Sequence, residues 1–458
     1  MTVPSSGTRG HPVTFGAYGT GALPIITGFN VLTGFGALSP NVYQLTGVTT
    51  QPKVVAYNRT LLKYHNVGTA IGLNEWDWNT NVLYINVGAD PNDGTVEVGQ
   101  RDYQIVFTNK DYVILDGLTL TGANLSSVNL STSADNEIIQ NCTIYNTFRG
   151  ISAESDAGNN NTIQDNTIYN TVEYGVLWTN QTSTGTLIQK NTIHNVGGKG
   201  GGATNMQGMY LHIGSGTIVQ NNTIYECGDT YADHGIYLGG AAGVIVRYNN
   251  IYNNSHGWGV KVSNSHNVDV YYNLLYGNGG GVIIEVGTPT YVNVYNNLIA
   301  NSSSNGQGLR VDAGDHITWK NNIIYNVYYT SWNAGTMYNL VFDFNNTAAV
   351  TNFVSDHNVV YHPTATANYA FYCGAGQTWA AWQAHGLDAH SLNVDPKFVS
   401  TTDFHLQPTS PLINAGTNVG LSQDYYGTYV PQGLAPDIGA YEFLGLQPVK
   451  GLRIIKSD

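Results

Sequence analysis

The sequence has 458 residues, of which 42% are apolar and only 10% are charged, and its formal net charge is −13. The apolar content argues against a disordered chain, and the negative charge without a Lys/Arg cluster argues against nucleic acid as a partner. No apolar run approaches the ~18 residues of a membrane-spanning helix, so no membrane span is expected.

Residues 1–110 are predicted to form irregular strands, namely the first coils of a solenoid and its cap. The chain opens MTVPSSGTRG, which lacks the basic and apolar regions of a secretory signal peptide. An extracellular location would therefore need a leader that precedes this sequence or another export route. Trp76 and Trp78 in the segment NEWDWNT are expected to pack inside the cap, with a platform for sugars as the alternative.

A repeat of roughly 24 residues runs through residues 111–352, and QDNTIYN (164–170) is a typical copy. The recurring asparagine is placed at Asn166, Asn191, Asn222, Asn250, Asn273, Asn297, Asn322 and Asn358. Short segments rich in Ile, Val, Tyr and Thr favour strands, and a drifting period of this length is typical of a solenoid whose insertions emerge as loops. We therefore predict an all-β parallel β-helix, with asparagines stacked about 4.8 Å apart inside one turn.

A second element follows each asparagine block, as in HGIYLGG (234–240) and WGVKVSN (258–264). Each copy reads glycine, apolar, variable, apolar, variable, so the apolar positions line the core and the variable ones form two exposed columns. The first column contains Ser152, Leu177, Tyr210, Tyr237, Lys261, Ile283 and Arg310. The second column contains Glu154, Thr179, His212, Gly239, Ser263, Glu285 and Asp312.

Regularity fades in residues 353–458, which are predicted to form C-terminal coils and a capping module. A short helix is expected within QTWAAWQAHGLDAH (377–390), and the tail 449–458 is either a last strand or a disordered end. Asp395, Asp424 and Asp437 are interpreted as turn and capping residues. A bound Ca²⁺ is the alternative, although their spacing matches no compact calcium loop.

Several segments resemble a known superfamily. Residues 2–28 and 111–124 are similar to the opening coils of bacterial secreted proteins of the pectate-lyase-like superfamily, and 395–418 with APDIGAYEF (435–443) is similar to a C-terminal module of such proteins. The resemblance implies a right-handed parallel β-helix at the cell surface or outside the cell. The superfamily includes polysaccharide lyases, glycoside hydrolases, epimerases, phage tailspikes and adhesins, so no single activity follows and no catalytic residue is carried over.

The exposed columns of the middle coils are the candidate site, because coil stacking gathers charged and aromatic side chains on a surface roughly 20 Å long. The candidate catalytic residues are Lys261, Glu285, Arg310 and Asp312, and the candidate substrate-binding residues are Tyr210, His212, His234, Tyr237 and Trp258. Aromatic faces stack on sugar rings, and charges position hydroxyls or carboxylates. His234 has a second interpretation as a buried, hydrogen-bonded histidine.

Two chemistries fit these residues. Neighbouring carboxylates of Glu285 and Asp312 would raise one pKa and supply the acid and base of a glycosidase. Alternatively, Lys261 and Arg310 would neutralise a uronate while Lys261 or a tyrosine removes its α-proton, as in a lyase. A third interpretation is that opposite charges on adjacent coils only keep the register.

We therefore predict an extracellular polysaccharide-active protein, either a polysaccharide lyase or a glycoside hydrolase. The alternative is a non-catalytic structural or adhesive protein, such as a phage tail component or a surface filament subunit, which the low charge and the Tyr/Asn/Gly-rich composition favour. The two hypotheses differ in what covers Lys261, Glu285 and Arg310. A cleft walled by loops favours an enzyme, and a flat face in a filament contact favours the alternative.

Overall fold

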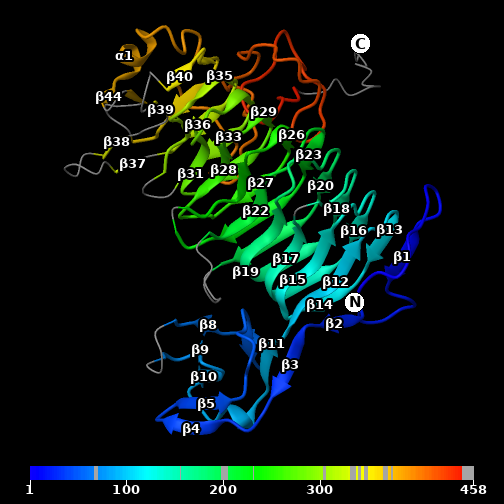
Figure 1. Cartoon of the computed structure of the whole chain (residues 1–458). Helices are drawn as coiled ribbons and strands as arrows, with labels where there is room; N and C mark the ends of the chain where they lie inside the picture. The colour runs from blue at the N-terminus through cyan, green and yellow to red at the C-terminus, as the bar shows by residue number, and fades with distance from the viewer. Residues whose placement is uncertain are drawn as a thin grey trace, which may run out of the picture.

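The computed structural model shows an all-β parallel solenoid of about nine turns with coils of about 25 residues, which confirms the predicted fold class (Figure 1). The described residues are 1–66, 71–154, 156–197, 205–230, 232–302, 306–327, 329–330, 337–338, 342–344, 349–364, 370–372 and 375–445. Among them, no helix has the length and apolar character that crossing a lipid bilayer requires.

One long parallel sheet takes one short strand from each coil. Its strands are β1 (Val13–Gly16), β13 (Val113–Asp116), β16 (Ile138–Gln140), β18 (Thr162–Gln164), β20 (Leu187–Gln189), β23 (Thr217–Gln220), β26 (Ala242–Arg247), β29 (His266–Tyr271), β32 (Thr290–Tyr295), β35 (Gly314–Lys320), β40 (Val350–Thr351) and β41 (Val354–Asp356).

The larger sheet wraps around a corner of the coil and therefore contains two parallel ladders. The first is formed by β2 (Ile25–Thr27), β14 (Thr119–Thr121), β17 (Thr143–Ala153), β19 (Thr167–Trp178), β21 (Thr192–Val196), β24 (Thr223–Cys227), β27 (Asn250–Tyr252), β30 (Leu274–Tyr276), β33 (Leu298–Ala300), β36 (Ile323–Tyr325) and β42 (Val359–Tyr361). The second is formed by β12 (Arg101–Thr108), β15 (Ala123–Ser131), the later halves of β17 and β19, β22 (Gln207–Leu211), β25 (Ile236–Gly239), β28 (Trp258–Ser263), β31 (Gly280–Glu285), β34 (Leu309–Val311), β39 (Phe342–Phe344) and β43 (Ala370–Tyr372).

The predicted asparagine ladder is present inside one turn of the coils. Its members are Asn166, Asn191, Asn222, Asn249, Asn273, Asn297, Asn322 and Asn358, and each side-chain Nδ2 donates to the next Oδ1 over 3.0 Å. The assignment of Asn250 was wrong by one position. Asn250 starts β27 in register with Thr223, whereas Asn249 points inward. The segment RYNNIYN contains adjacent asparagines, and the sequence pattern did not separate them.

The first glycine of each second element lies where two coils approach closely. At Gly208, a Cβ would come within 2.5 Å of the Gly235 carbonyl oxygen and 2.6 Å of the Ile224 side chain. Any larger residue would force the coils apart, which explains the repeated glycine. On the first ladder of the larger sheet, aromatic rings stack from coil to coil with centroids 4.7 to 5.2 Å apart. These rings belong to Tyr145, Tyr169, His194, Tyr225, Tyr252 and Tyr276.

Residues 1–110 divide into two parts. β1 and β2 join the coils, but the chain between β2 and β12 forms a separate module of two sheets, which projects from one end of the solenoid (Figure 1). We call it the antiparallel module, because its strands pair antiparallel except for β8 with β9. Its strands are β3 (Phe29–Leu32), β11 (Val96–Gly99), β6 (Val55–Tyr57) and β7 (Thr60–Leu61) in one sheet, and β4 (Gly36–Ser39), β5 (Val42–Thr46), β10 (Val82–Asn86), β9 (Glu75–Asn79) and β8 (Lys63–Tyr64) in the other, with a 3₁₀ turn η1 (Pro91–Asp93). Sequence analysis did not separate this module from the coils.

Trp76 is fully buried in the core of the antiparallel module, and the indole N–H of Trp78 donates to the Val48 carbonyl over 2.7 Å. Both tryptophans therefore have the expected packing role. The module contacts the solenoid through an apolar cluster and through Asn146, which donates to the Arg59 carbonyl over 2.7 Å. The residues of that cluster are Phe29, Val54, Ala56, Leu61, Phe148 and Val172.

The C-terminal region contains the expected short helix, α1 (Trp379–Gln383), after β44 (Ala375–Gln377), and a small hairpin of β37 (Tyr329–Thr330) and β38 (Met337–Tyr338) precedes it. Asp395, Asp424 and Asp437 accept hydrogen bonds from backbone N–H groups, which confirms their turn and capping roles. The tail 449–458 lies outside the described residues.

Candidate functional site

The two exposed columns lie in the predicted register. Tyr210 pairs with Tyr237 and Tyr237 with Lys261 in the first column, and Ser263 pairs with Glu285 in the second. Arg310 continues the first column two coils beyond Lys261. The alignment of the repeats therefore gave the correct neighbours. It was wrong about exposure at four positions, because Ser152, Leu177, Ile283 and Ser263 are buried.

Side chains on this face form a continuous series of contacts across six coils, which we call the exposed row. Its members in order are Arg149, Tyr174, Tyr210, Tyr237, Lys261 and Glu285. The Arg149 guanidinium lies 5.8 Å from the Tyr174 ring, and ring centroids are 5.8 Å apart for Tyr174–Tyr210 and 5.0 Å apart for Tyr210–Tyr237. The Lys261 ammonium lies 4.8 Å from the Tyr237 ring and 2.7 Å from Glu285 Oε1. Five coil spacings make the row roughly 24 Å long.

The candidate charged residues are joined in ion pairs. Glu285 is paired with Lys261 over 2.7 Å, and Asp312 is paired with the Arg310 guanidinium over 2.8 Å. Each carboxylate thus faces a cation, which offsets the repulsion between Glu285 and Asp312 on which the glycosidase hypothesis depended. All four side chains remain between 14% and 28% exposed, so solvent and ligands reach them.

His234 does not line the surface, which corrects the hypothesis that it contacts substrate. It is only 2% exposed, its Nδ1 accepts a hydrogen bond from the Trp258 backbone N–H over 3.1 Å, and its ring packs edge-on against Tyr237. Burial lowers the pKa of His234 to about 3, so the ring stays neutral. His234 therefore supports the exposed row from beneath. Trp258 is half-buried on the surface, and its ring covers Gly280.

Tyr174 and Tyr210 of the exposed row remain protonated near neutral pH. Burial raises the pKa of Tyr174 to about 12 and also raises that of Tyr210. Both phenols are therefore suited to donate hydrogen bonds rather than to act as bases. His212, one column away, is half-buried beside Gly240 and widens the polar surface.

Sequence analysis missed a charged cluster at the first coils of the exposed row. Arg149 contacts two carboxylates, Glu173 Oε2 at 2.5 Å through Nε and Glu154 Oε1 at 2.7 Å through Nη1. Glu154 was placed in the second column, but Arg149 and Glu173 were not considered. Arg149 directly precedes Gly150 and is in register with Tyr174, whereas Glu173 lies one position before Tyr174. The two residues share no column, so the repeat alignment did not bring them together.

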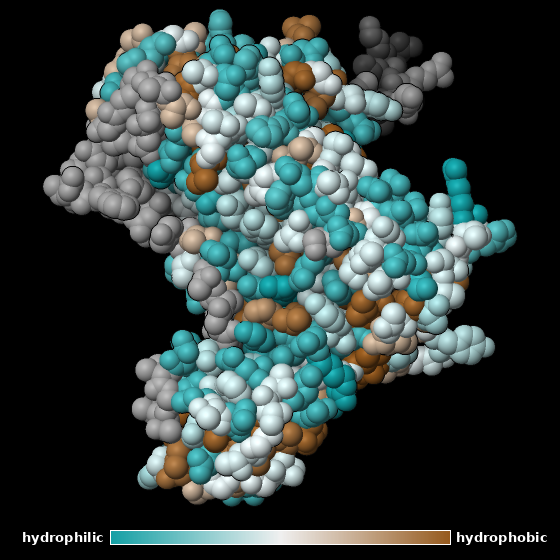
Figure 2. Space-filling model, in the orientation of Figure 1, coloured by the Kyte–Doolittle hydropathy of each residue, from teal (hydrophilic) through white to brown (hydrophobic). Residues whose placement is uncertain are grey.

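This cluster lies next to the antiparallel module, because Phe148, which precedes Arg149, packs against it. A groove of about 210 Å³ runs between Leu61 of the module and the coil corner at Asn170, Asn195 and Glu226. Figure 2 shows the module projecting from the coil stack, with a hollow between the two. No residue of the exposed row lines this groove, so the groove flanks the row and does not enclose it.

The described residues that could share a metal ion lie away from the exposed row. Within the described residues, Asp356, His357 and His390 form the group of carboxylate and imidazole side chains whose atoms come close enough to share an ion. Asp356 ends β41, which belongs to the other long sheet. Asp356, His357 and His390 are therefore not part of the exposed row.

Comparison with known proteins supports the fold. The family model described as a right-handed β-helix region matches residues 76–205 and 182–299. The structure of XylC in complex with xylose has a TM-score of 0.62 at 14% identity, covering 96% of this chain and 91% of that chain. The periplasmic alginate epimerase AlgG has a TM-score of 0.44 at 12% identity, covering 56% of this chain and 61% of that chain. The α-1,3-glucanase of Streptomyces thermodiastaticus has a TM-score of 0.39 at 11% identity, covering 74% and 89%. A search of curated proteins gave no match.

Proposed function

Because the chain is a right-handed parallel β-helix protein, we propose that it is an extracellular enzyme that binds a polysaccharide along the exposed row and cleaves it. The observation that carries the proposal is the unbroken sequence of contacts from Arg149 through three tyrosines to Lys261 and Glu285. Tyrosine faces bind sugar rings, and the charged ends position hydroxyls or carboxylates. The row is long enough for several sugar units.

Two reactions are compatible with this row. For hydrolysis, Glu154 and Glu173 supply two carboxyl groups, as glycosidases use. Because the Arg149 guanidinium favours the ionised form of both, hydrolysis requires the substrate to displace Arg149 from the carboxyl group that acts as the acid. For elimination, Lys261 and Arg310 provide the positive charge that a uronate needs, and the Glu285 carboxylate beside Lys261 accepts the α-proton. The protonated Tyr210 donates its proton to the departing oxygen. The proposal covers cleavage, and the assay decides between the two reactions.

The test is a panel of neutral and uronate-containing polysaccharides, read both for new reducing ends and for the absorbance of unsaturated uronates. Reducing ends with absorbance identify a lyase, and reducing ends alone identify a hydrolase. Glu154→Gln should abolish hydrolysis, and Lys261→Met should abolish elimination. Arg247→Gln, which removes a charge from the other long sheet, is the matched control and should leave either activity unchanged.

The competing hypothesis is a structural or adhesive protein. A folded protein that releases no ends from any member of the panel would support that hypothesis and overturn the enzyme proposal. Activity that survives both Glu154→Gln and Lys261→Met would keep the enzyme but move its site away from the exposed row.

A further inference from the structure

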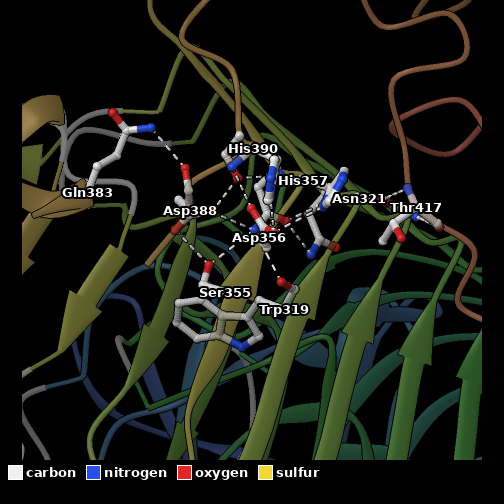
Figure 3. A network of polar contacts seen from close by, with 12 residues as sticks. Trp319, Asn321, Ser355, Asp356, His357, Gln383, Asp388, His390 and Thr417 are labelled. Carbon is white, nitrogen blue, oxygen red and sulfur yellow. Dashed lines mark hydrogen bonds and ion pairs between the residues drawn. The ribbon is translucent and has the colours of Figure 1, made fainter. Parts of the chain in front are cut away.

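Three potential metal ligands converge at the C-terminal end of the solenoid, on a different face from the exposed row. His390 Nδ1 lies 2.7 Å and His357 Nδ1 lies 3.2 Å from the same oxygen, Oδ2 of Asp356. The two imidazole rings are stacked with centroids 5.0 Å apart. Figure 3 shows both histidines directed at the Asp356 carboxylate.

One nitrogen atom of this group, His357 Nδ1, has no hydrogen-bond partner. His390 makes two hydrogen bonds to Asp356, one from its backbone N–H and one between Nδ1 and Oδ2, both 2.7 Å long. His357 Nδ1 is buried and makes no hydrogen bond, although it lies within 3.2 Å of Asp356 Oδ2. Nδ1 of His357 is therefore placed to offer a lone pair to a metal ion.

The surroundings hold the ligands in place. His357 adopts a left-handed backbone conformation with φ of 56°, immediately before Asn358, the last member of the asparagine ladder. Asp388 is fully buried and accepts hydrogen bonds from four side chains, which fixes the loop that carries His390. Those donors are Ser355, Trp382, Asn358 and Ser391. The loop that ends the asparagine ladder at Asn358 therefore also places His390 opposite Asp356.

We propose that Asp356, His357 and His390 bind one divalent transition-metal ion of the zinc class. Two imidazoles and one carboxylate are a ligand set that suits Zn²⁺ and Co²⁺. Ligand bonds of about 2.1 Å put ligand atoms roughly 3.4 Å apart around a tetrahedral ion. The 3.2 Å between His357 Nδ1 and Asp356 Oδ2 is close to this value, and His390 Nδ1, at 2.7 Å, must move outward to exchange its hydrogen bond for a metal bond. His390 is 69% exposed, which leaves the fourth position open to water. Lys320 is in register with Asp356 on the preceding coil, and its charge opposes the ion.

Such an ion would join the end of β41 to the loop 388–391, which lies more than 30 residues further along the chain. It would therefore hold the cap onto the last regular coils, in addition to the hydrogen bonds of Asp388. This role does not depend on the exposed row or on any activity of the protein.

The test uses tag-free, chelator-treated full-length protein titrated with Zn²⁺ by calorimetry and with Co²⁺ by visible absorption. The wild type should bind one ion per chain and unfold at a higher temperature when Zn²⁺ is added. His390→Ala and Asp356→Asn should each weaken binding by about 100-fold or more, because loss of even an outer partner of a metal ligand costs 10–100-fold. His405→Ala is the matched control, since His405 contacts Asp403 over 2.5 Å in a pair that lacks a third ligand among the described residues.

Because His390 is exposed, His390→Ala should unfold like the wild type when no metal is present, which separates loss of binding from loss of fold. The proposal is overturned if the wild type binds no stoichiometric ion. It is also overturned if His390→Ala and Asp356→Asn bind as tightly as the wild type, or if His405→Ala causes the same loss.

Discussion

The asparagine ladder and the exposed row run along the same coils but differ in how they vary. Inside the turn, asparagine repeats from Asn166 to Asn358, and each amide bonds the next over 3.0 Å. On the outside, the residue type varies along the row, from Arg149 through three tyrosines to Lys261 and Glu285. A buried amide can be satisfied only by a matching group about 4.8 Å away. The outer side chains are positioned by the pairing of their strands and need no matching group. A column of identical residues therefore stabilises the fold, whereas a column of different residues can carry a binding or catalytic site.

The sharpest way to test this contrast is to remove one charge from the exposed row. Glu285→Gln keeps the shape of the side chain but removes the partner of Lys261. We expect cleavage of the polysaccharide identified in the panel to fall about 100-fold, which is the lower range for loss of a group that assists proton transfer. The free energy of unfolding should change by only about 1 kcal/mol, because both side chains reach solvent. Full activity in Glu285→Gln would contradict the role of this end of the row.

The opposite result is expected inside the turn. Asn273→Ala removes a side chain that donates to Asn297 and to the Val246 carbonyl and accepts from Asn249. Because several buried groups lose their partners at once, unfolding in urea should show a loss on the order of 3 kcal/mol. Asn293→Ala, which removes an outward amide from the next coil, is the control and should cost less than about 1 kcal/mol. Similar losses in both variants would show that the ladder does not stabilise the coils.

A third test concerns a buried carboxyl group, in contrast to the side-chain amides buried inside the turns of other coils. Glu137 is fully buried, accepts from the Val113 N–H over 3.0 Å and receives no second partner at Oε1. Burial raises the pKa of Glu137 to about 8 from an ordinary value of 4.5. Between pH 4.5 and 8 the folded state therefore holds a proton that the unfolded state releases, and stability falls as pH rises through this window.

Glu137→Gln removes this titration while keeping an acceptor for Val113. The difference in unfolding free energy between the wild type and Glu137→Gln should therefore change by up to a few kcal/mol between pH 4.5 and 8, with the wild type losing stability. Urea unfolding at several pH values measures it. A difference that is constant across the window would show that Glu137 ionises normally in the folded protein.

The sequence was sufficient for the solenoid because its signal is repetition. The spacing of asparagines and glycines determined the coil register, and the register determined that Tyr237, Lys261 and Arg310 share a face. The error in the ladder concerned a single position. Asn249 and Asn250 have the same side chain, so only the structure shows which one points inward.

The remaining features depend on contacts between distant segments, which a repeat does not encode. The antiparallel module contacts the coils through pairs such as Arg59 and Asn146, which are 87 positions apart. The group at His390 depends on a loop placed by a buried aspartate. His234 had two interpretations from the sequence, and the buried one is correct: its partner is the Trp258 N–H of the next coil, 24 positions away.

The smallest expected effect tests whether a uniform aromatic column behaves like the ladder or like the exposed row. Tyr225 stacks between His194 at 4.7 Å and Tyr252 at 4.9 Å, so its two faces are occupied by neighbouring rings and not free for a sugar. Tyr225→Leu should therefore cost about 1 kcal/mol of unfolding free energy and leave the affinity for the polysaccharide unchanged. Tyr210→Leu should weaken that affinity by a comparable free energy, about fivefold. If Tyr225→Leu weakened binding as much as Tyr210→Leu, residue variation along a column would not distinguish a binding surface from a structural one.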